Sequence, residues 1–294
     1  MAIIAHPDFK RHMARRQWQG RAFHALCLMA VGVALAMLVL LLGYLIQQGV
    51  SRVSWDFING FPSRNPDEAG IKAALLGSIY VVLIAAVVAF TLGVGAAVYL
   101  EEYASRNWRT RLVQINIANL AGVPSIVYGI LGLEIFVRSL GLGRSVLAGG
   151  LTMGLLVLPI IIIAAQEAVR AVPRSVREGA YALGATRWQA IWHLVLPQAL
   201  PGILTGVILA VSRALGETAP LIVMGALTFV PFAPDGPFSR FTVLPIQIFN
   251  WISRPQAGFH QAAAAGIIVL LILLLAMNAG AILLRNKFQR RPEA

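Results

Sequence analysis

One arginine and one glutamate stand in the segment SRALGETAP (212–220), within a long apolar stretch. Arg213 and Glu217 are the only charged residues between positions 201 and 230. Hydrocarbon accepts charge poorly, since a central arginine or aspartate costs about 2.5–3.5 kcal/mol on insertion scales. A guanidinium suits oxyanions because its planar donors match two oxygens at once. These residue types therefore predict an oxyanion contact inside a membrane segment, with Glu217 neutralising Arg213 when no anion is bound.

The spacing of this pair predicts its geometry. Residues four apart share one helix face, so Arg213 and Glu217 are expected to meet. Pro220 cannot donate to the carbonyl of Gly216, so Gly216 and Pro220 are predicted hinge residues. Thr218 is predicted either to satisfy that carbonyl or to face the path of the anion. Two alternatives stay open: Glu217 pairs with a cation on a partner chain, or the pair locks two membrane subunits together and never meets an anion.

Apolar helices must position these residues. The chain of 294 residues is 58% hydrophobic and 12% charged, whereas a soluble domain is about a quarter charged. A spanning helix needs about 20 apolar residues. Six stretches meet that length, the fifth interrupted only by Arg213 and Glu217: 25–46, 73–100, 112–133, 145–165, 203–230 and 261–284. The sequence therefore predicts an all-α integral membrane protein with six transmembrane helices in one domain (25–284).

The basic residues are distributed unevenly between the connections. The two tails (1–24 and 285–294) and the second and fourth connections hold sixteen Lys and Arg, and the other connections hold seven. The positive-inside rule then places both termini in the cytoplasm. The net charge of +12 is thus explained by membrane topology, and no nucleic-acid partner is expected. Cys27 is the single cysteine, so a disulfide or a cysteine-ligated metal is excluded.

The longest cytoplasmic connection carries helix-capping patterns. Ser175 with Glu178, and Thr186 with Gln189, have the spacing of a capping box, so each pair is predicted to open a short helix. Gly184 stands between the two helices, where a left-handed residue is wanted. The connection is therefore predicted to be folded.

The second of these helices is predicted to end at Pro197 and to carry an apolar face. Two interpretations of this loop (172–203) stay open. It is either an amphipathic helix resting at the membrane interface or a docking element for a partner. The apolar face consists of Trp188, Ile191, Trp192 and Val195.

The loop resembles a known family at this point. Membrane subunits of ABC importers carry the pattern E-A-A-x3-G-x9-I-x-L-P. This chain departs from it at Gly179, in place of Ala, and at Leu194, in place of Ile. The resemblance implies that the loop couples to an ATPase through Glu178, Gly179, Ala180, Gly184, Leu196 and Pro197.

Further segments resemble the PstA-type permeases of phosphate ABC importers, from about residue 70 onward. They are VYLEEYA (98–104), GVPSIVYGILG (122–132), REGAYALGAT (177–186) and SRALGETAPLI (212–222). The resemblance implies a type I ABC importer permease in a bacterial inner membrane, carrying inorganic phosphate. It further implies a sister permease (PstC-type), an ATPase dimer (PstB-type) and an external phosphate-binding protein (PstS-type). No Walker A motif occurs here, so ATP hydrolysis is expected in a partner chain, and no cofactor is expected.

Other candidates are weaker. The third span is predicted to be narrow and kinked, with close helix packing favoured, because it contains Gly122, Pro124, Ser125, Gly129 and Gly132. Ser125 could line the path. Glu134 and Arg138 are predicted to form a solvated pair, and the loop 228–261 is predicted to be external. No metal cluster or catalytic pair is seen in the sequence. An importer for another oxyanion and a secondary transporter driven by an ion gradient remain as alternative functions.

Overall fold

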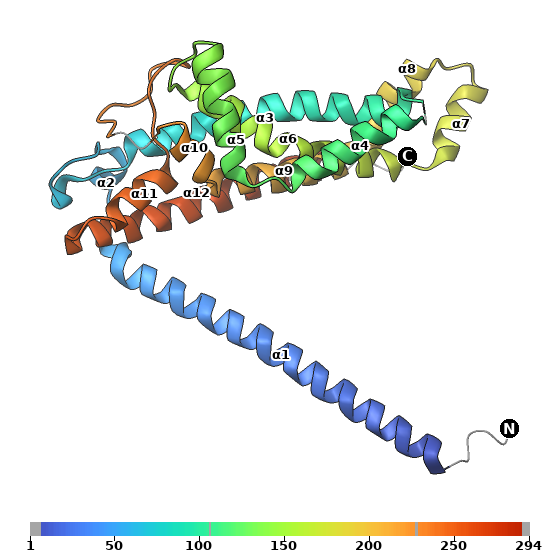
Figure 1. Ribbon diagram of the computed structural model, residues 1–294, viewed down its shortest axis with the longest axis horizontal. Coiled ribbons are helices and arrows are strands. Elements are labelled where there is room, and N and C mark those ends of the chain that lie inside the picture. Colours follow the sequence, from blue (N-terminus) through green and yellow to red (C-terminus); the bar gives the residue numbers. More distant parts are fainter. Residues whose placement is uncertain (1–6, 106, 227–228, 290–294) are drawn as a thin grey trace.

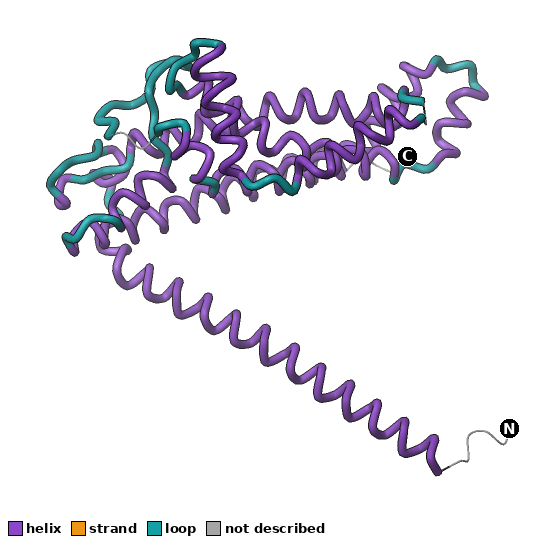
Figure 2. Tube along the Cα trace, viewed as in Figure 1, coloured by secondary structure: helices purple, strands orange, loops and turns teal. Residues whose placement is uncertain are grey.

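The computed structural model describes residues 7–105, 107–226 and 229–289, and helices dominate them. Within these ranges the only strand-like feature is an isolated antiparallel bridge between Ser145 and Arg240. Figure 2 shows long helices whose connecting loops gather mainly at one end of the molecule. The long helices are α1 (Pro7–Gly49), α3 (Lys72–Val98), α6 (Val146–Arg170), α9 (Leu196–Gly216) and α12 (Ala257–Gln289). The shorter ones are α2 (Trp55–Asn59), α4 (Trp108–Ala121), α5 (Ser125–Gly132), α7 (Arg174–Ala182), α8 (Arg187–Ala190), α10 (Ala219–Val223) and α11 (Leu244–Ile252).

Helix α6 lies at the centre of the body, between α3 and α9 (Figure 1). Small residues allow the close approach. A Cβ on Gly93 of α3 would lie 2.8 Å from Ile161, and a Cβ on Gly206 of α9 would lie 2.3 Å from Ala164. Close packing of small residues is what joins helices where no hydrophobic driving force acts between them. The three helices therefore form one packed unit.

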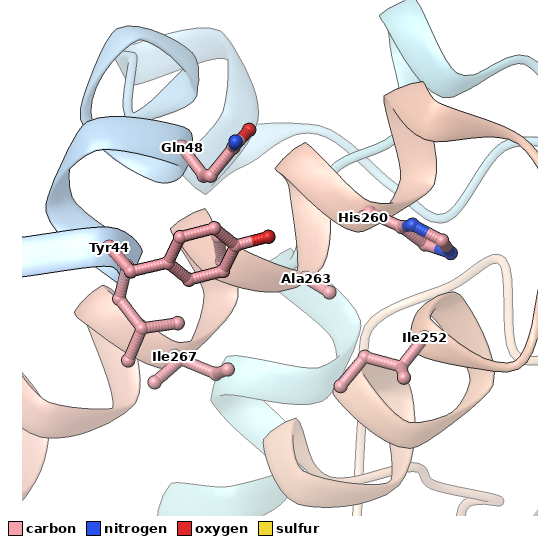
Figure 3. Close-up of a pocket in the computed structure, with 8 residues that line it drawn as sticks. Tyr44, Gln48, Ile252, His260, Ala263 and Ile267 are labelled. Atoms are coloured by element: carbon pink, nitrogen blue, oxygen red, sulfur yellow. The ribbon is translucent and has the colours of Figure 1, made fainter. Parts of the chain in front are cut away.

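Helix α1 leaves this body and extends away from it (Figure 1). Its residues 16–41 are exposed, and it contacts α12 near its own C-terminal end, where Gly49 lies against the backbone of Ala264. A cavity of about 230 Å³ opens in the angle between α1 and α12, lined by residues such as Tyr44 and Ile267 (Figure 3). The exposed apolar length of α1 is suited to lipid or to another membrane subunit.

Among the described residues, five helical segments are long and apolar enough to span a membrane, and a bent helix pair makes a sixth candidate. Three predicted stretches, 25–46, 73–100 and 261–284, fall within three of the five, and 145–165 matches a fourth except for Ser145, which caps the helix. The bent pair corresponds to the predicted stretch 112–133.

The third span has the predicted kink, but it is not a continuous helix over 112–133, because α4 ends at Ala121 and the chain turns by 103° before α5. Pro124 has an extended backbone (φ −55°, ψ 136°) and precedes the first residue of α5. The hydroxyl of Tyr128 donates to the carbonyl of Leu120 over 2.7 Å. That hydrogen bond crosses the bend and satisfies a carbonyl that α4 leaves free at its end.

The prediction of a helix over 203–230 is also wrong at both ends. Helix α9 ends at Gly216, because Glu217 is extended (φ −78°, ψ 129°). Pro220 lies in the first turn of α10, where a missing N–H costs nothing. Pro197 does not end a helix, since it lies in the first turn of α9 after a π-helical turn, η6 (Ile191–Val195), that follows α8. The fifth span therefore runs from Arg187 to Gly216.

Candidate functional site

Arg213 and Glu217 form an ion pair where the fifth span ends. Arg213 Nε lies 3.3 Å from Glu217 Oε1, and 56% of the arginine side chain and 21% of the glutamate side chain are exposed. The pair predicted from the sequence therefore exists. It closes across the end of α9, because Glu217 has left the helix. The guanidinium keeps exposed donors, so an oxyanion can reach it without breaking the pair.

Two broken helices meet beside this pair. Helix α5 packs against α10 so closely that a Cβ on Gly129 would lie 2.7 Å from Cα of Pro220. Ser125 is the first residue of α5. Thr218 directly precedes α10, and its carbonyl accepts a hydrogen bond from the N–H of Ile222 in that helix (3.0 Å). The segments GVPSIVYGILG and GETAPLI, 91 positions apart at Gly129 and Pro220, are thus neighbours.

Gly216 and Pro220 flank a complete helix break, where the sequence predicted a bend. The carbonyl of Gly216 has no partner within α9, because the helix ends at this residue. Thr218 makes backbone contacts within the first turn of α10. The hinge role of Gly216 and Pro220 stays a prediction.

A polar contact next to Arg213 was not foreseen. The hydroxyl of Ser212 is hydrogen-bonded to the side-chain amide of Asn278 on α12 and to the carbonyl of Ile208 (2.7 Å). This contact fixes α9 against α12 directly beside Arg213. The lone asparagine within the apolar run 261–284 was the available clue.

The loop predicted to couple to an ATPase (172–203), called the coupling loop below, lies at the other end of the body, where α7 and α8 are found (Figure 1). Gly184 has φ +82°, as expected for the turn between the helices. Thr186 and Gln189 form the predicted capping box. The capping box predicted for Ser175 and Glu178 is wrong: α7 already begins at Arg174, after Pro173, and no side chain caps it. A proline fixes φ at a value suited to entering a helix, so no cap is needed there.

The apolar side chains of this loop fall into two sets. Ile191 and Val195 are buried in the body, whereas Trp188 and Trp192 are exposed and stacked, with ring centroids 5.4 Å apart. The predicted single apolar face is therefore divided. Leu183, just before Gly184, is 91% exposed, which leaves an apolar tip free at the turn.

The remaining coupling residues lie as follows. Ala180 is buried, while Glu178 and Gly179 are exposed on α7, and a Cβ on Gly179 would meet nothing within 4 Å. Leu196 and Pro197 lie in the first turn of α9. The exposed acid and the buried alanine give α7 one face toward the body and one exposed face.

Ion pairs hold α6 and this loop to the second span, and the sequence did not predict them. Glu101 and Glu102, in the π-helical turn η4 (Tyr99–Tyr103) that extends α3, bind Arg170 and Arg177. Their adjacent carboxylates in VYLEEYA were the available clue. By contrast, Glu134 and Arg138 form the solvated surface pair that was predicted.

Comparison with known proteins agrees with this architecture. Residues 89–291 match the family described as "Binding-protein-dependent transport system inner membrane component". The chain belongs to this family. It is therefore an inner-membrane component of a binding-protein-dependent transport system, as its apolar helices require.

Individual relatives cover most of the chain. The "Phosphate transport system permease protein PstA" of Mycobacterium leprae is 36% identical over 256 residues, covering 84% of this chain and 82% of that protein. The "Probable ABC transporter permease protein YqgI" of Bacillus subtilis is 33% identical over 265 residues, 86% of this chain and 90% of that protein. Among solved structures, a bacterial ABC transporter that imports the acidic polysaccharide alginate shares the fold. Its TM-score is 0.64 at 16% identity, over 92% of this chain and 99% of that one.

Proposed function

We propose that this protein is the PstA-type permease of an ATP-driven phosphate importer. It forms the pathway together with a sister permease and is coupled to a separate ATPase dimer. An external phosphate-binding protein delivers the anion, and both termini of the permease lie in the cytoplasm. The observation that carries the proposal is the partly exposed Arg213 guanidinium at the broken end of an apolar span. Relatives named phosphate permeases support phosphate as the anion.

The position of Arg213 supports a pathway shared between two subunits. Within this chain 56% of its side chain is exposed, although α9 is apolar enough to span the bilayer. A charged side chain within a span faces protein or a water-filled cavity and not lipid. The surface around Arg213 therefore belongs against the sister permease, with the anion passing between the two chains.

The second site supports coupling to an ATPase. Helix α7 lies at the end of the body (Figure 1), with Glu178 exposed and Leu183 protruding. Trp188 and Trp192 are placed on the exposed side of the same loop, and tryptophan favours the membrane interface. We infer that the tryptophans rest at the interface while α7 and Leu183 reach the ATPase. The chain itself acts as a non-catalytic membrane subunit.

Uptake by substituted complexes tests the pathway. Arg213→Gln removes the charge and leaves Glu217 unpaired, so phosphate uptake in vesicles should be lost while the complex assembles and hydrolyses ATP. Arg213→Lys keeps the charge without the two-pronged donation, so partial uptake should remain. Arg138→Gln is the matched control, because it breaks an exposed pair and should leave uptake unchanged.

Three results would redirect the proposal. Uptake that falls only in step with the yield of sister permease would assign Arg213 to the subunit interface. Equal competition by sulfate in the wild-type complex would replace phosphate with a broader class of oxyanion. Normal uptake by Arg213→Gln would remove Arg213 from the pathway.

A further inference from the structure

The cytoplasmic end of the second span holds the coupling loop through an ion pair that is almost fully buried. Arg177 Nη2 and Nε lie 2.7 and 3.0 Å from Oε1 of Glu102. The exposed fractions of the two side chains are 16% and 8%. The surface pair of Arg138 and Glu134 keeps 66% and 59% exposed. Removing one partner of a buried pair leaves an uncompensated charge, so the buried pair is far more sensitive to substitution.

Arg177 also binds the backbone. Its Nη1 donates to the carbonyl of Val172 over 2.7 Å, and its Nη2 donates to the carbonyl of Val169 over 2.9 Å. These carbonyls belong to the last turn of α6 and the residues after it. One guanidinium on α7 thus joins α7, the end of α6 and the end of the second span.

The residues beside Glu102 contact α6 and the start of α8. Glu101 accepts from Arg170 Nη2 over 2.5 Å and from the buried Gln166 Nε2 over 3.2 Å, both on α6. The guanidinium of Arg187, at the start of α8, lies 5.5 Å from the ring centroid of Tyr103. Three successive residues of η4 therefore contact α6, α7 and α8.

The form of η4 bears on what these contacts do. The turn continues α3 directly, since Val98 and Tyr99 both have helical backbone angles. Helix α3 in turn packs along α6. π-Helical turns are rare and occur often at functional sites. The contacts of α7 are thus joined to α3 through one short turn that is continuous with the helix.

We propose that Glu102 and Arg177 are positioning residues that fasten the coupling loop to the second span. Through them, a movement imposed on α7 is delivered to α3 and is not absorbed within the loop. The proposal rests on the proposed function, because it requires an ATPase docked at α7. It assigns a role in energy coupling to residues that contact neither nucleotide nor transported anion.

The experiment uses the complete importer in proteoliposomes, with its binding protein. Glu102→Gln keeps an oxygen acceptor near Arg177 and removes the charge. Arg177→Lys keeps the charge and removes the fork that reaches the carboxylate and both carbonyls. Glu134→Gln, at the exposed surface pair, is the matched control. Four quantities are measured: co-purifying ATPase, basal ATP hydrolysis, the stimulation of hydrolysis by phosphate-loaded binding protein, and phosphate taken up per ATP.

We expect both variants to bind ATPase and to hydrolyse ATP at a basal rate within about twofold of wild type. Stimulation and uptake per ATP should fall at least fivefold, because a 1 kcal/mol loss of coupling already corresponds to about fivefold. A purely structural role would lower all four quantities together. Full stimulation in Glu102→Gln, or losses that follow complex yield, would overturn the inference alone. A wild-type complex without ATPase would overturn the proposed function, and this inference with it.

Discussion

The contact between α5 and α10 requires a residue without a Cβ at position 129. A Cβ there would lie 2.7 Å from both Cα and the carbonyl oxygen of Pro220. Non-bonded carbon atoms are best separated by about 3.5–4.0 Å, so Gly129→Ala forces the two backbones apart by about 1 Å. Both colliding atoms are backbone atoms of a proline, which cannot rotate away.

Overpacking of this kind costs about 1–3 kcal/mol. A loss of 1 kcal/mol lowers Tm by about 2–4 °C in chains of 150–250 residues, so a drop of roughly 2–12 °C is expected. The same energy changes the ratio of two conformations by about 5- to 150-fold. Phosphate uptake should therefore fall at least fivefold if the α5–α10 contact belongs to the transporting state.

The assay compares Gly129→Ala in α5 with Gly122→Ala, which lies in the bend just before α5. A Cβ on Gly122 would have its nearest neighbour, the carbonyl oxygen of Asn119, at 3.5 Å, which is ordinary contact. The Gly122 variant should keep the Tm and uptake of the wild type. Equal stability and equal uptake in the two variants would refute the packing argument.

Two further predictions concern the loop and the topology. Gly184→Val should release the ATPase and abolish uptake while the chain inserts normally, because φ +82° costs an L-residue about 1–2 kcal/mol and more when it is β-branched. Gly184→Asn should retain most activity. Normal uptake by the valine variant would contradict the prediction that the Gly184 turn is needed for ATPase binding. A reporter after Ala294, or within 101–111, should report a cytoplasmic site and one near Asp235 an external site, with reversed results overturning the orientation.

The sequence predicted the chemistry of the site better than its backbone. Arg213 and Glu217 pair as their spacing suggested, but the pair closes over a helix end. Apolar composition shows which residues avoid water and does not show whether they form one helix or two. For that reason Gly122 and Pro124 predicted a kink in the stretch 112–133, but not a complete break between two helices.

The coupling loop shows the same division. Local patterns correctly predicted the Gly184 turn and the Thr186 capping box, because both depend on neighbours within four residues. The contact of Glu102 with Arg177 joins residues 75 positions apart. No local pattern specifies such a contact, and adjacent carboxylates at the end of a span have many solvated alternatives.

The broken third span has a consequence for the biogenesis of this chain. Helix α4 has 14 residues and is about 21 Å long at 1.5 Å per residue, short of the roughly 30 Å of hydrocarbon. Helix α5 has eight residues and continues as a π-helical turn to Ser139, which is still too short to cross that hydrocarbon. Neither piece can therefore be inserted as an independent span.

The partner that α5 needs is synthesised late. Pro220 leaves the ribosome 91 residues after Gly129, which takes roughly 5–20 s at 5–20 residues per second. During that interval α5 can pack against α6, but its close contact with α10 is missing. The quality control of this protein should therefore act on the segment between α4 and α5, and chains truncated before α10 should be degraded even though four of their spans are complete.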